Sequence, residues 1–289
     1  MTFTRATKKQ QKCRMAITGP AKAGKTRTAL SIAKHLGARV AVIDTERGSA
    51  SKYAGEAFAP AEFDVAELRT FSPAEYRKAM REAAGYDVLV IDSLSHAWMG
   101  AGGLLDQKDK STSKSSFDAW RTLTPQHNEL VDALLGFPGH LIVTMRVKTE
   151  YVIETINGKQ VPRKVGLAPV QRDGIEYEFD VLAEVDHDHS LHIPSSRCDA
   201  LDGMTIRKPT GEEIASTLLA WLDDGAPTPT IEARLKSLRT KAALHEFLTE
   251  ARARIREETD RAVSEPWVRE AAERLGGDVA KAVAFVWPA

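Results

Sequence analysis

The sequence predicts an α/β protein whose mainly parallel sheet is flanked by helices, with extra β-hairpins and a small C-terminal helical domain. Up to residue 145, continuous apolar runs that end in a polar residue alternate with amphipathic helical patterns, as is typical of parallel strands covered on both faces. From residue 150 to 195 the chain carries hairpin signals, and beyond residue 230 only helical periodicity remains. A glycine-rich loop between the first apolar run and the first helical pattern indicates phosphate binding.

The glycine-rich loop GPAKAGKT fits the phosphate-binding pattern G-x-x-x-x-G-K-[ST]. Its glycines let backbone N–H groups point at the β-phosphate of a nucleotide, and the following helix adds its dipole. In such a loop Lys25 reaches the β- and γ-phosphates, and the hydroxyl of Thr26 holds Mg²⁺. A predicted strand at 14–18 leads in and a helix at 25–36 leads out, which disfavours a glycine turn without a ligand. We therefore expect a P-loop for ATP and Mg²⁺ made of Gly19, Pro20, Ala21, Lys22, Ala23, Gly24, Lys25 and Thr26.

The composition is that of an ordinary globular protein, since 43% of the 289 residues are hydrophobic. This is enough for one large α/β domain and a small appendage. No apolar run is long enough to cross a bilayer and no secretory signal is found, so we expect a cytoplasmic protein without a membrane partner. The two cysteines, Cys13 and Cys198, are too few for a disulfide framework or a zinc site. Lysine plus arginine equals aspartate plus glutamate at 40 each, so nucleic acid could bind only through local patches.

The chain divides by composition into four parts: a basic N-terminal tail at 1–13, a core at 14–224, a linker at 225–230 and a helical domain at 231–289. We interpret the basic start as a solvated tail, with a DNA-contacting arm as the alternative. The C-terminal part is predicted to pack around its own apolar residues, and a role in docking a partner or DNA stays open. The cations at the start of the chain are Arg5, Lys8, Lys9, Lys12 and Arg14.

Three further buried strands are predicted in the core, at 38–44, 86–92 and 139–145. The capping box Ser72-Pro73-Ala74-Glu75 starts a helix that runs to about residue 84. Thr124-Pro125 is expected to start the next helix, which ends near Gly136. The lysine- and serine-rich stretch 106–116 is expected to be a mobile loop. A second capping box, Thr210-Gly211-Glu212-Glu213, starts the last helix of the core.

Two hairpins are predicted after the strand at 139–145. Asn157-Gly158 is the strongest short turn signal, and it joins runs at 150–156 and 160–165. A second pair of runs, 178–185 and 190–194, flanks another turn. Histidines in and beside this second turn are interpreted as turn residues and not as zinc ligands, because no cysteine lies near them: His187, His189 and His192.

Acidic residues at the ends of two predicted strands separate the classes of P-loop protein. Asp92 follows the apolar run VLVI, so its carboxylate stands at a strand tip, where it can hold the hydration shell of Mg²⁺. The next residue is Ser93, which disfavours classes whose catalytic glutamate directly follows this aspartate. We therefore assign the base to Glu46, which follows the strand at 38–44 on the same edge of a parallel sheet.

Turn capping is the alternative role for Asp44, which ends the strand at 38–44, and for Glu46, which follows it. For Glu46 the sequence favours catalysis, whereas for Asp44 turn capping and support of the site are equally good interpretations. No N-K-x-D sequence is present, which disfavours a G protein.

This combination of motifs resembles the RecA-like ATPases. It lies in the stretches GPAKAGKT (19–26), VIDTERGSASKYA (42–54) and VLVIDS (88–93). Three later stretches are similar to bacteriophage and prophage ATP-binding proteins related to RecA and to the Sak-type single-strand annealing ATPases: HLIVTMRVKTEYVIE (140–154), RKVGLAPVQRDGIEYEFDV (163–181) and SSRCDALDG (195–203). The resemblance covers about residues 13–224. It implies a RecA-like P-loop NTPase core in a phage or prophage protein of a bacterial host that serves DNA recombination or replication.

RecA-like cores commonly place ATP between subunits, so the resemblance implies a homo-oligomer in which a neighbouring subunit supplies a cation to the transition state. Arg197, after a predicted strand, is a candidate for such a finger. Arg146, at the end of the strand at 139–145, is a candidate sensor of the γ-phosphate in its own subunit. Lys164 and Arg172 are further options, and each of these cations alone is also consistent with a solvated or ion-paired side chain.

Cations and a tyrosine in the first hairpin fit single-stranded DNA, because lysines neutralise phosphates and an aromatic ring can stack on a base. By resemblance, RecA-like proteins carry a DNA loop at this place. A solvent-facing hairpin of alternating charge is the alternative. The hairpin residues are Lys148, Tyr151, Lys159, Arg163 and Lys164, and the loop after the strand of Asp92 adds Lys108, Lys110 and Lys114.

The sequence thus predicts an ATPase with a RecA-like core that hydrolyses ATP with Mg²⁺ and acts on single-stranded DNA in annealing or strand exchange. Lys25 and the loop amides bind phosphate, and Glu46 activates water. One alternative is a motor, either a helicase or a helicase loader. Another is an interaction module that binds ATP, hardly turns over, and recruits a single-strand binding protein or other replication and recombination proteins. A small-molecule kinase is disfavoured because no arginine-rich lid is present.

Overall fold

The structure of this protein, a computed structural model, describes residues 5–113, 115–156, 159–226, 231–258 and 261–288. The chain forms two compact units. One unit comprises Gln11–Asp224, and the other combines Met1–Gln10 with Gly225–Ala289.

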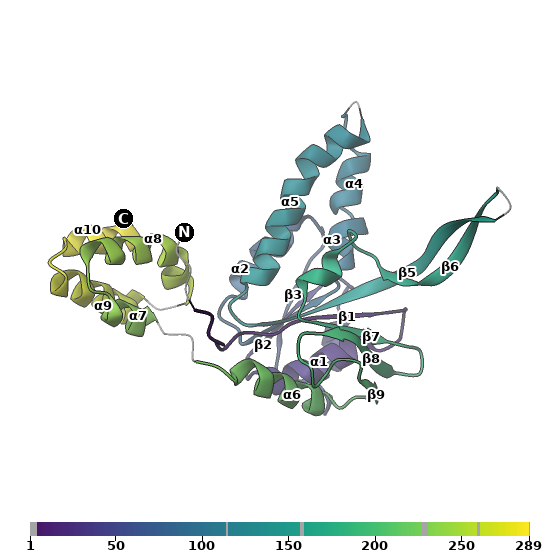
Figure 1. Ribbon diagram of the computed structural model, residues 1–289, viewed down its shortest axis with the longest axis horizontal. Helices are drawn as coiled ribbons and strands as arrows, with labels where there is room; N and C mark the ends of the chain where they lie inside the picture. The colour runs from purple at the N-terminus through teal and green to yellow at the C-terminus, as the bar shows by residue number, and fades with distance from the viewer. Residues whose placement is uncertain (1–4, 114, 157–158, 227–230, 259–260, 289) are drawn as a thin grey trace. The chain divides into compact units, whose positions relative to one another are not determined.

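A sheet forms the centre of the larger unit (Figure 1). Its strands follow the order β3-β2-β4-β5-β1-β7-β8-β9, and β6 pairs with β5 outside this path. Pairing is parallel from β3 to β7 and antiparallel within β7–β8, β8–β9 and β5–β6. The predicted mainly parallel sheet with extra hairpins is therefore confirmed. The strands are β1 (Arg14–Gly19), β2 (Val40–Asp44), β3 (Asp64–Glu67), β4 (Val88–Asp92), β5 (His140–Ile156), β6 (Lys159–Pro169), β7 (Val181–Val185), β8 (Ser190–Ser196) and β9 (Thr205–Arg207).

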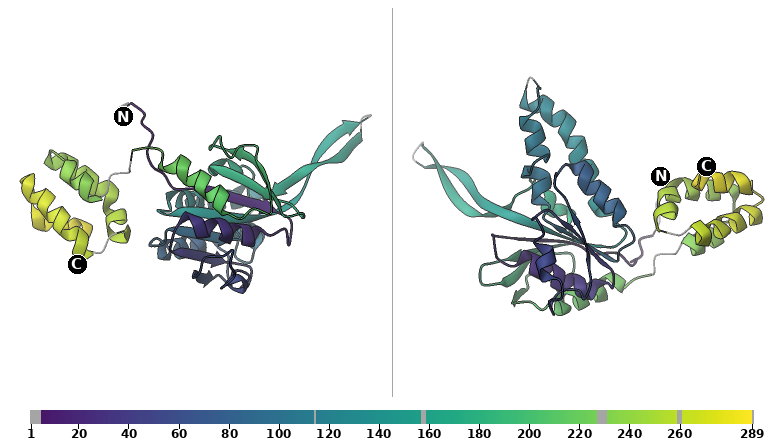
Figure 2. Two further views of the ribbon diagram at one scale, coloured as in Figure 1. Left: turned by 90° about the horizontal axis from the view of Figure 1, so that it is seen from below. Right: turned by 180° about the vertical axis from the view of Figure 1, so that it is seen from behind.

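Helices cover both faces of the sheet (Figure 2). The first face packs against α1 and α6, and the second packs against α2 and α5. Successive strand residues alternate between these two apolar cores: in β1, Met15 and Ile17 join the first and Ala16 joins the second. Burial on both faces explains the continuous apolar runs of the sequence. The helices of this unit are α1 (Lys25–Leu36), α2 (Pro73–Glu82), α3 (Ser95–Met99), α4 (Leu104–Asp109), α5 (Ser116–Gly136) and α6 (Glu212–Asp223), with short 3-10 turns η1 (Ala50–Tyr53) and η2 (Ile175–Glu178).

The region before β5 differs from the sequence prediction. The stretch 106–116, expected to be a loop, is one only in part, because α4 extends to Asp109 and α5 begins at Ser116, which leaves residues 110–113 and 115 outside both helices. Ser115 caps α5 by accepting the N–H of Asp118 at 3.1 Å. Pro125 lies inside the helix instead of starting it. Burial of Ala119 and Leu123 in the turns before the proline outweighs the backbone hydrogen bond that the proline cannot make. The predicted end at Gly136 is confirmed.

Both predicted hairpins are confirmed. β5 continues far beyond the expected strand and pairs antiparallel with β6, with Ile156 opposite Lys159. The turn residues Asn157-Gly158 lie outside the described residues. In the second hairpin, the Asp186 carboxylate accepts the backbone N–H groups of the turn at Asp188 and Ser190, each at 2.9 Å.

The capping box expected before α6 is wrong, because Gly211 is the cap residue and no side chain caps the helix. Gly211 has a φ of 83°, and a Cβ at this position would come within 2.3 Å of the backbone of Ser31. The close approach of α6 to α1 therefore decides where the helix begins.

Arg14, the first residue of β1, is buried, although the sequence grouped it with the basic residues at the start of the chain. Only 9% of Arg14 is exposed. Its guanidinium donates to the carbonyls of Leu135 at 3.0 Å and Gly139 at 2.8 Å, and also to that of Phe137. Arg14 therefore binds the free carbonyl groups at the C-terminal end of α5.

We expect Arg14→Ala to lower the free energy of unfolding by about 3 kcal/mol, because it leaves several buried carbonyls without a donor. The loss can be measured by urea denaturation. The matched control is Arg39→Ala, whose side chain is 68% exposed beside Asp87 and which should change stability by no more than about 0.5 kcal/mol. If both substitutions lowered the free energy of unfolding equally, Arg14 would not have the assigned role as the donor to the carbonyls at the end of α5.

The smaller unit contains α7 (Ile231–Ser237), α8 (Lys241–Glu258), α9 (Arg261–Arg274) and α10 (Val279–Val286). These helices share a separate apolar core that includes Leu248, Val268 and Ala272, so the helical character predicted for 231–289 is confirmed. Lys9 forms a parallel bridge with Ala226 within this unit. No helix among the described residues has both the length and the apolar character needed to cross a membrane.

Candidate nucleotide site

The phosphate-binding loop lies between β1 and α1 and depends on its two glycines. Gly24, the cap residue of α1, has a φ of 102°, in the left-handed region that favours glycine. At Gly19 a Cβ would come within 2.4 Å of the carbonyl oxygen of Val185. Larger residues at either position would therefore displace the loop or the neighbouring strand β7.

Lys25 is the first residue of α1, and its ammonium bends back over the loop. It donates to the carbonyls of Gly19 at 2.9 Å and Pro20 at 2.8 Å. Burial lowers the pKa of Lys25, although the nearby charges of Asp92 and Glu46 oppose this effect. No carboxylate forms an ion pair with Lys25 in the part of the chain that the structure describes. A half-buried cation held only by carbonyls is well suited to an anionic ligand.

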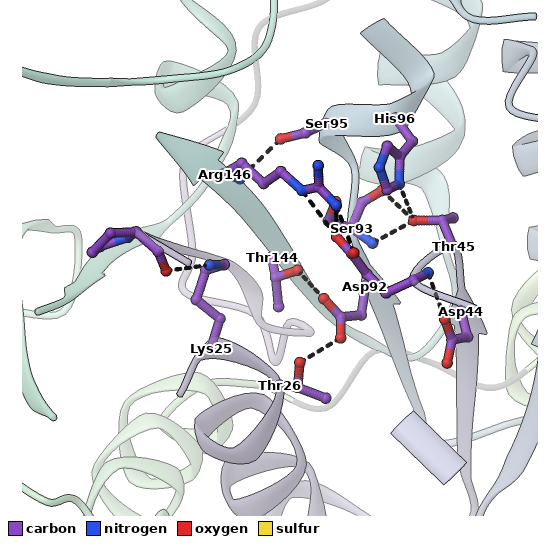
Figure 3. A network of polar contacts seen from close by, with 12 residues as sticks. Lys25, Thr26, Asp44, Thr45, Asp92, Ser93, Ser95, His96, Thr144 and Arg146 are labelled. Carbon is purple, nitrogen blue, oxygen red and sulfur yellow. Dashed lines mark hydrogen bonds and ion pairs between the residues drawn. The ribbon is translucent and has the colours of Figure 1, made fainter. Parts of the chain in front are cut away.

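Asp92 ends β4 at the centre of the site, where only 2% of it is exposed. One carboxylate oxygen accepts the hydroxyl of Thr26 at 2.6 Å, and the other accepts that of Thr144 at 2.5 Å (Figure 3). Burial is the main cause that raises the pKa of Asp92, and the two hydroxyl donors partly offset it. A carboxylate beside a threonine hydroxyl is a set of hard oxygen ligands that suits Mg²⁺.

Asp44 ends β2, Glu46 follows it, and the two acids have different roles. Asp44 is fully buried, and its carboxylate accepts the backbone N–H of Glu46 at 2.6 Å and that of Ala50 at 2.9 Å. Turn capping is therefore what Asp44 does. The capped turn directs the Glu46 side chain into the site, toward β4 and β5.

Glu46 forms a bidentate ion pair with Arg146. Arg146 donates from Nε and Nη2 to Oε1 at 3.0 and 2.8 Å, and from Nη2 to Oε2 at 2.6 Å. Burial alone would raise the pKa of Glu46, but the hydrogen bonds and charge of Arg146 outweigh burial and lower it. Glu46 is thus a carboxylate at neutral pH whose oxygens are already engaged by a cation.

Arg146 stands where the sheet passes into the long hairpin. Its backbone N–H donates to the Ser95 hydroxyl at 2.9 Å, and its carbonyl accepts the N–H of Val170 at 2.7 Å. Val170 directly follows β6, so Arg146 joins the root of the hairpin to Glu46. A ligand that draws Arg146 away from Glu46 would therefore affect both Glu46 and the root of the hairpin.

A cavity of about 620 Å³ opens over these groups. The structure thus brings together the loop, Glu46, Asp92 and Arg146, which the sequence places far apart, and it adds Tyr53 to the lining. A neighbouring cavity of about 400 Å³ shares Lys22, Gly24 and Tyr53 with the first and is also lined by Arg27, His189 and Lys208. His189 reaches the loop directly, with Nδ1 2.8 Å from the carbonyl of Ala23.

The remaining predicted site residues lie elsewhere. Arg197 is an exposed residue that pairs with Asp180 at 3.0 Å and lines a separate groove beside α6. Lys110 is paired with Asp106 at 2.7 Å. Lys148 is exposed on β5, and the strand register sets Tyr151 opposite Lys164, Val152 opposite Arg163 and Ile156 opposite Lys159. Lys114 lies outside the described residues.

Several residues of the site could not be assigned from the sequence. Thr45 accepts the Ser93 N–H at 2.7 Å and lies 2.7 Å from Nδ1 of His96, while Tyr76 donates to the Ser93 carbonyl at 2.8 Å. This network fixes the chain immediately after Asp92. Thr144 could have been noticed in the sequence, because it is a polar residue in the otherwise apolar run LIVTM.

Comparison with known proteins identifies a family and a similar solved structure. Residues 11–211 match the AAA domain family. Among solved structures, the chain is similar to the crystal structure of the RadB recombinase, with 15% sequence identity, a TM-score of 0.41, and coverage of 69% of this chain and 89% of that chain. No curated protein matches the chain. Because the family match spans well over half of the chain, the protein belongs to the AAA domain family.

Proposed function

We propose that this protein hydrolyses ATP with Mg²⁺ and uses the state of the nucleotide to control its binding to single-stranded DNA. The observation that carries the proposal is the convergence of Lys25, Asp92 with Thr26, and Glu46 on one edge of the sheet. These are a phosphate ligand, a magnesium ligand pair and a base, the three parts that ATP hydrolysis needs.

The residues present fit both ATP and Mg²⁺. The loop backbone and Lys25 would hold the β- and γ-phosphates, in place of the Gly19 and Pro20 carbonyls that the ammonium contacts here. Thr26 and Asp92 would hold the ion. When bound, Mg²⁺ neutralises charge on the phosphate oxygens.

Glu46 would orient the attacking water and accept its proton. For this its oxygens must be free of Arg146, which now occupies them. Arg146 is more strongly attracted to a γ-phosphate than to a single carboxylate because the phosphate carries more charge. In this proposal Arg146 leaves Glu46 for the γ-phosphate, so the base becomes available only when ATP is in place.

Three features support single-stranded DNA as the partner. The hairpin strands carry the cations Lys148, Lys159 and Lys164, its root is bonded to Arg146, and the sequence resembles phage recombination ATPases. We place the protein in DNA recombination or replication, by annealing or strand exchange, in a phage or prophage. A homo-oligomer with ATP at subunit interfaces follows from the same resemblance, with the exposed guanidinium of Arg197 as the finger.

The ion pair of Glu46 and Arg146 also favours a second candidate, an interaction module that binds ATP and hardly turns over. In that case Arg146 would stay on Glu46 after ATP binds, and the nucleotide would serve to recruit replication or recombination proteins.

Nucleotide control of DNA binding can be tested by fluorescence anisotropy with a labelled thymidine oligomer. We expect affinities in Mg-ADP and in a non-hydrolysable ATP analogue to differ by about tenfold, as is usual for coupled sites. A duplex of the same length serves as the control for the preference for single strands. The same affinity in both nucleotides, or no binding at all, would contradict the proposed function.

A further inference from the structure

Two tryptophans stack on each other outside the apolar cores. Trp98 on α3 and Trp120 on α5 have ring centroids 5.4 Å apart and an interplanar angle of 18°. Both are half-buried, and neither belongs to an apolar core in the part of the chain that the structure describes. This pair of large, flat side chains therefore lies where α3 meets α5, at the edge of the apolar cores.

A cation lies over one of the two tryptophans, Trp120. The Arg172 guanidinium is 5.9 Å from the centroid of the Trp120 ring. Arg172 forms no ion pair with any residue that the structure describes, so its charge remains available to a ligand. The neighbouring acid Asp118 is used within the chain, because it accepts the Ser115 hydroxyl at 2.8 Å.

The same three segments expose further apolar side chains. Phe117 stands one helical turn before Trp120 and is 80% exposed, and Met99 next to Trp98 is 44% exposed. Tyr177, in the short turn after Arg172, is 79% exposed. Together with the stacked pair, these side chains give a surface of flat rings with one uncompensated cation.

We propose that Trp98, Trp120 and Arg172 form a platform on which an unpaired base of single-stranded DNA stacks. The choice of this ligand rests on the proposed function. Aromatic rings and guanidinium planes stack on any base, and the cation neutralises an adjacent phosphate. A duplex hides the base faces, so the platform would select single strands.

The platform is connected to the nucleotide site through two segments, the start of α3 and the residues that precede Arg172. α3 begins three residues after Asp92. Gln171, only 4% exposed, donates from Nε2 to the carbonyl of Leu94 at 3.1 Å and so fastens the segment of Arg172 to the start of α3. One residue earlier, Val170 is bonded to Arg146. A movement of Arg146 toward a γ-phosphate would thus reach the platform through its own backbone.

The test compares a thymidine oligomer with an abasic oligomer of the same length and charge, by anisotropy in Mg²⁺ and a non-hydrolysable ATP analogue. We expect the full-length protein to prefer the thymidine oligomer. Trp120→Ala should bind it about tenfold more weakly and bind the abasic oligomer unchanged, because one stacked base contributes about this much. Trp120→Phe should keep most of the preference. Arg172→Ala should reduce it, whereas the matched control Arg121→Ala, whose exposed side chain follows Trp120, should not.

The outcomes separate the platform from the proposed function. Equal binding of both oligomers by the wild type, or a base preference that survives in both Trp120→Ala and Arg172→Ala, overturns the platform and leaves the proposed function standing. Failure to bind either oligomer overturns both. If Trp120→Ala changes self-association and not DNA binding, the surface is a protein contact and the proposal is wrong. Arg172→Ala decides the question if Trp120→Ala does not fold.

Discussion

Replacement of Glu46 by glutamine is expected to lower kcat for ATP hydrolysis by about 1,000-fold, the usual contribution of a general base. Glutamine has the same shape as glutamate and can still accept hydrogen bonds from Arg146, but it cannot take a proton from water. ATP should bind at least as tightly as in the wild type, because a negative charge near the γ-phosphate has been removed. Single-turnover hydrolysis and equilibrium nucleotide binding measure the two quantities separately.

The matched control for this substitution is Glu67→Gln. Glu67 ends β3, the strand next to β2, and pairs in register with Asp44, but it is exposed and does not line the nucleotide cavity. Its replacement should leave kcat within about twofold. Full activity in Glu46→Gln would show that Glu46 is not the base. The assignments of the phosphate and magnesium ligands would not be affected.

Replacement of Lys25 by alanine is expected to have the second large effect, a loss of turnover of about 1,000-fold or more together with weaker ATP binding. In the proposed function Lys25 would bind the β- and γ-phosphates, and its charge acts in a half-buried site where it is poorly screened. Because it would contact phosphate in both the ground and transition states, both the Kd for ATP and kcat should change.

Lys34→Ala is the control for Lys25→Ala. Lys34 lies on the same helix, but its ammonium is exposed and donates to the carbonyl of Ala57 at 2.7 Å, away from the cavity. Nucleotide binding and turnover should be those of the wild type. Undiminished ATP binding in Lys25→Ala would show that the nucleotide occupies a different cavity.

The parts of the site that follow from local sequence were predictable. The loop pattern places Lys25 and Thr26 within a few residues of each other, and the carboxyl ends of parallel strands bring Asp92 and Glu46 to the same edge. Continuous apolar runs identified the buried strands because both faces of the sheet are covered.

Contacts between distant segments could not be predicted. The ion pair of Glu46 and Arg146 joins residues 100 positions apart, and nothing in either segment specifies the other. Burial of Arg14 depends on the end of α5, and the stacking of Trp98 on Trp120 depends on how α3 meets α5. The start of α5 was predicted wrongly because a proline at the first turn is a strong local signal that tertiary packing overrides here.

The most direct test of the central claim is steady-state ATP hydrolysis with and without single-stranded DNA, measured on the wild type and on Lys25→Ala. We expect Mg²⁺-dependent hydrolysis that single strands stimulate, because DNA binding and the release of Glu46 both act through Arg146 and the hairpin root. This activity should vanish in Lys25→Ala. Slow hydrolysis that does not respond to DNA would contradict the account and favour the interaction module, with the helices of residues 231–289 as the place to look for its partner.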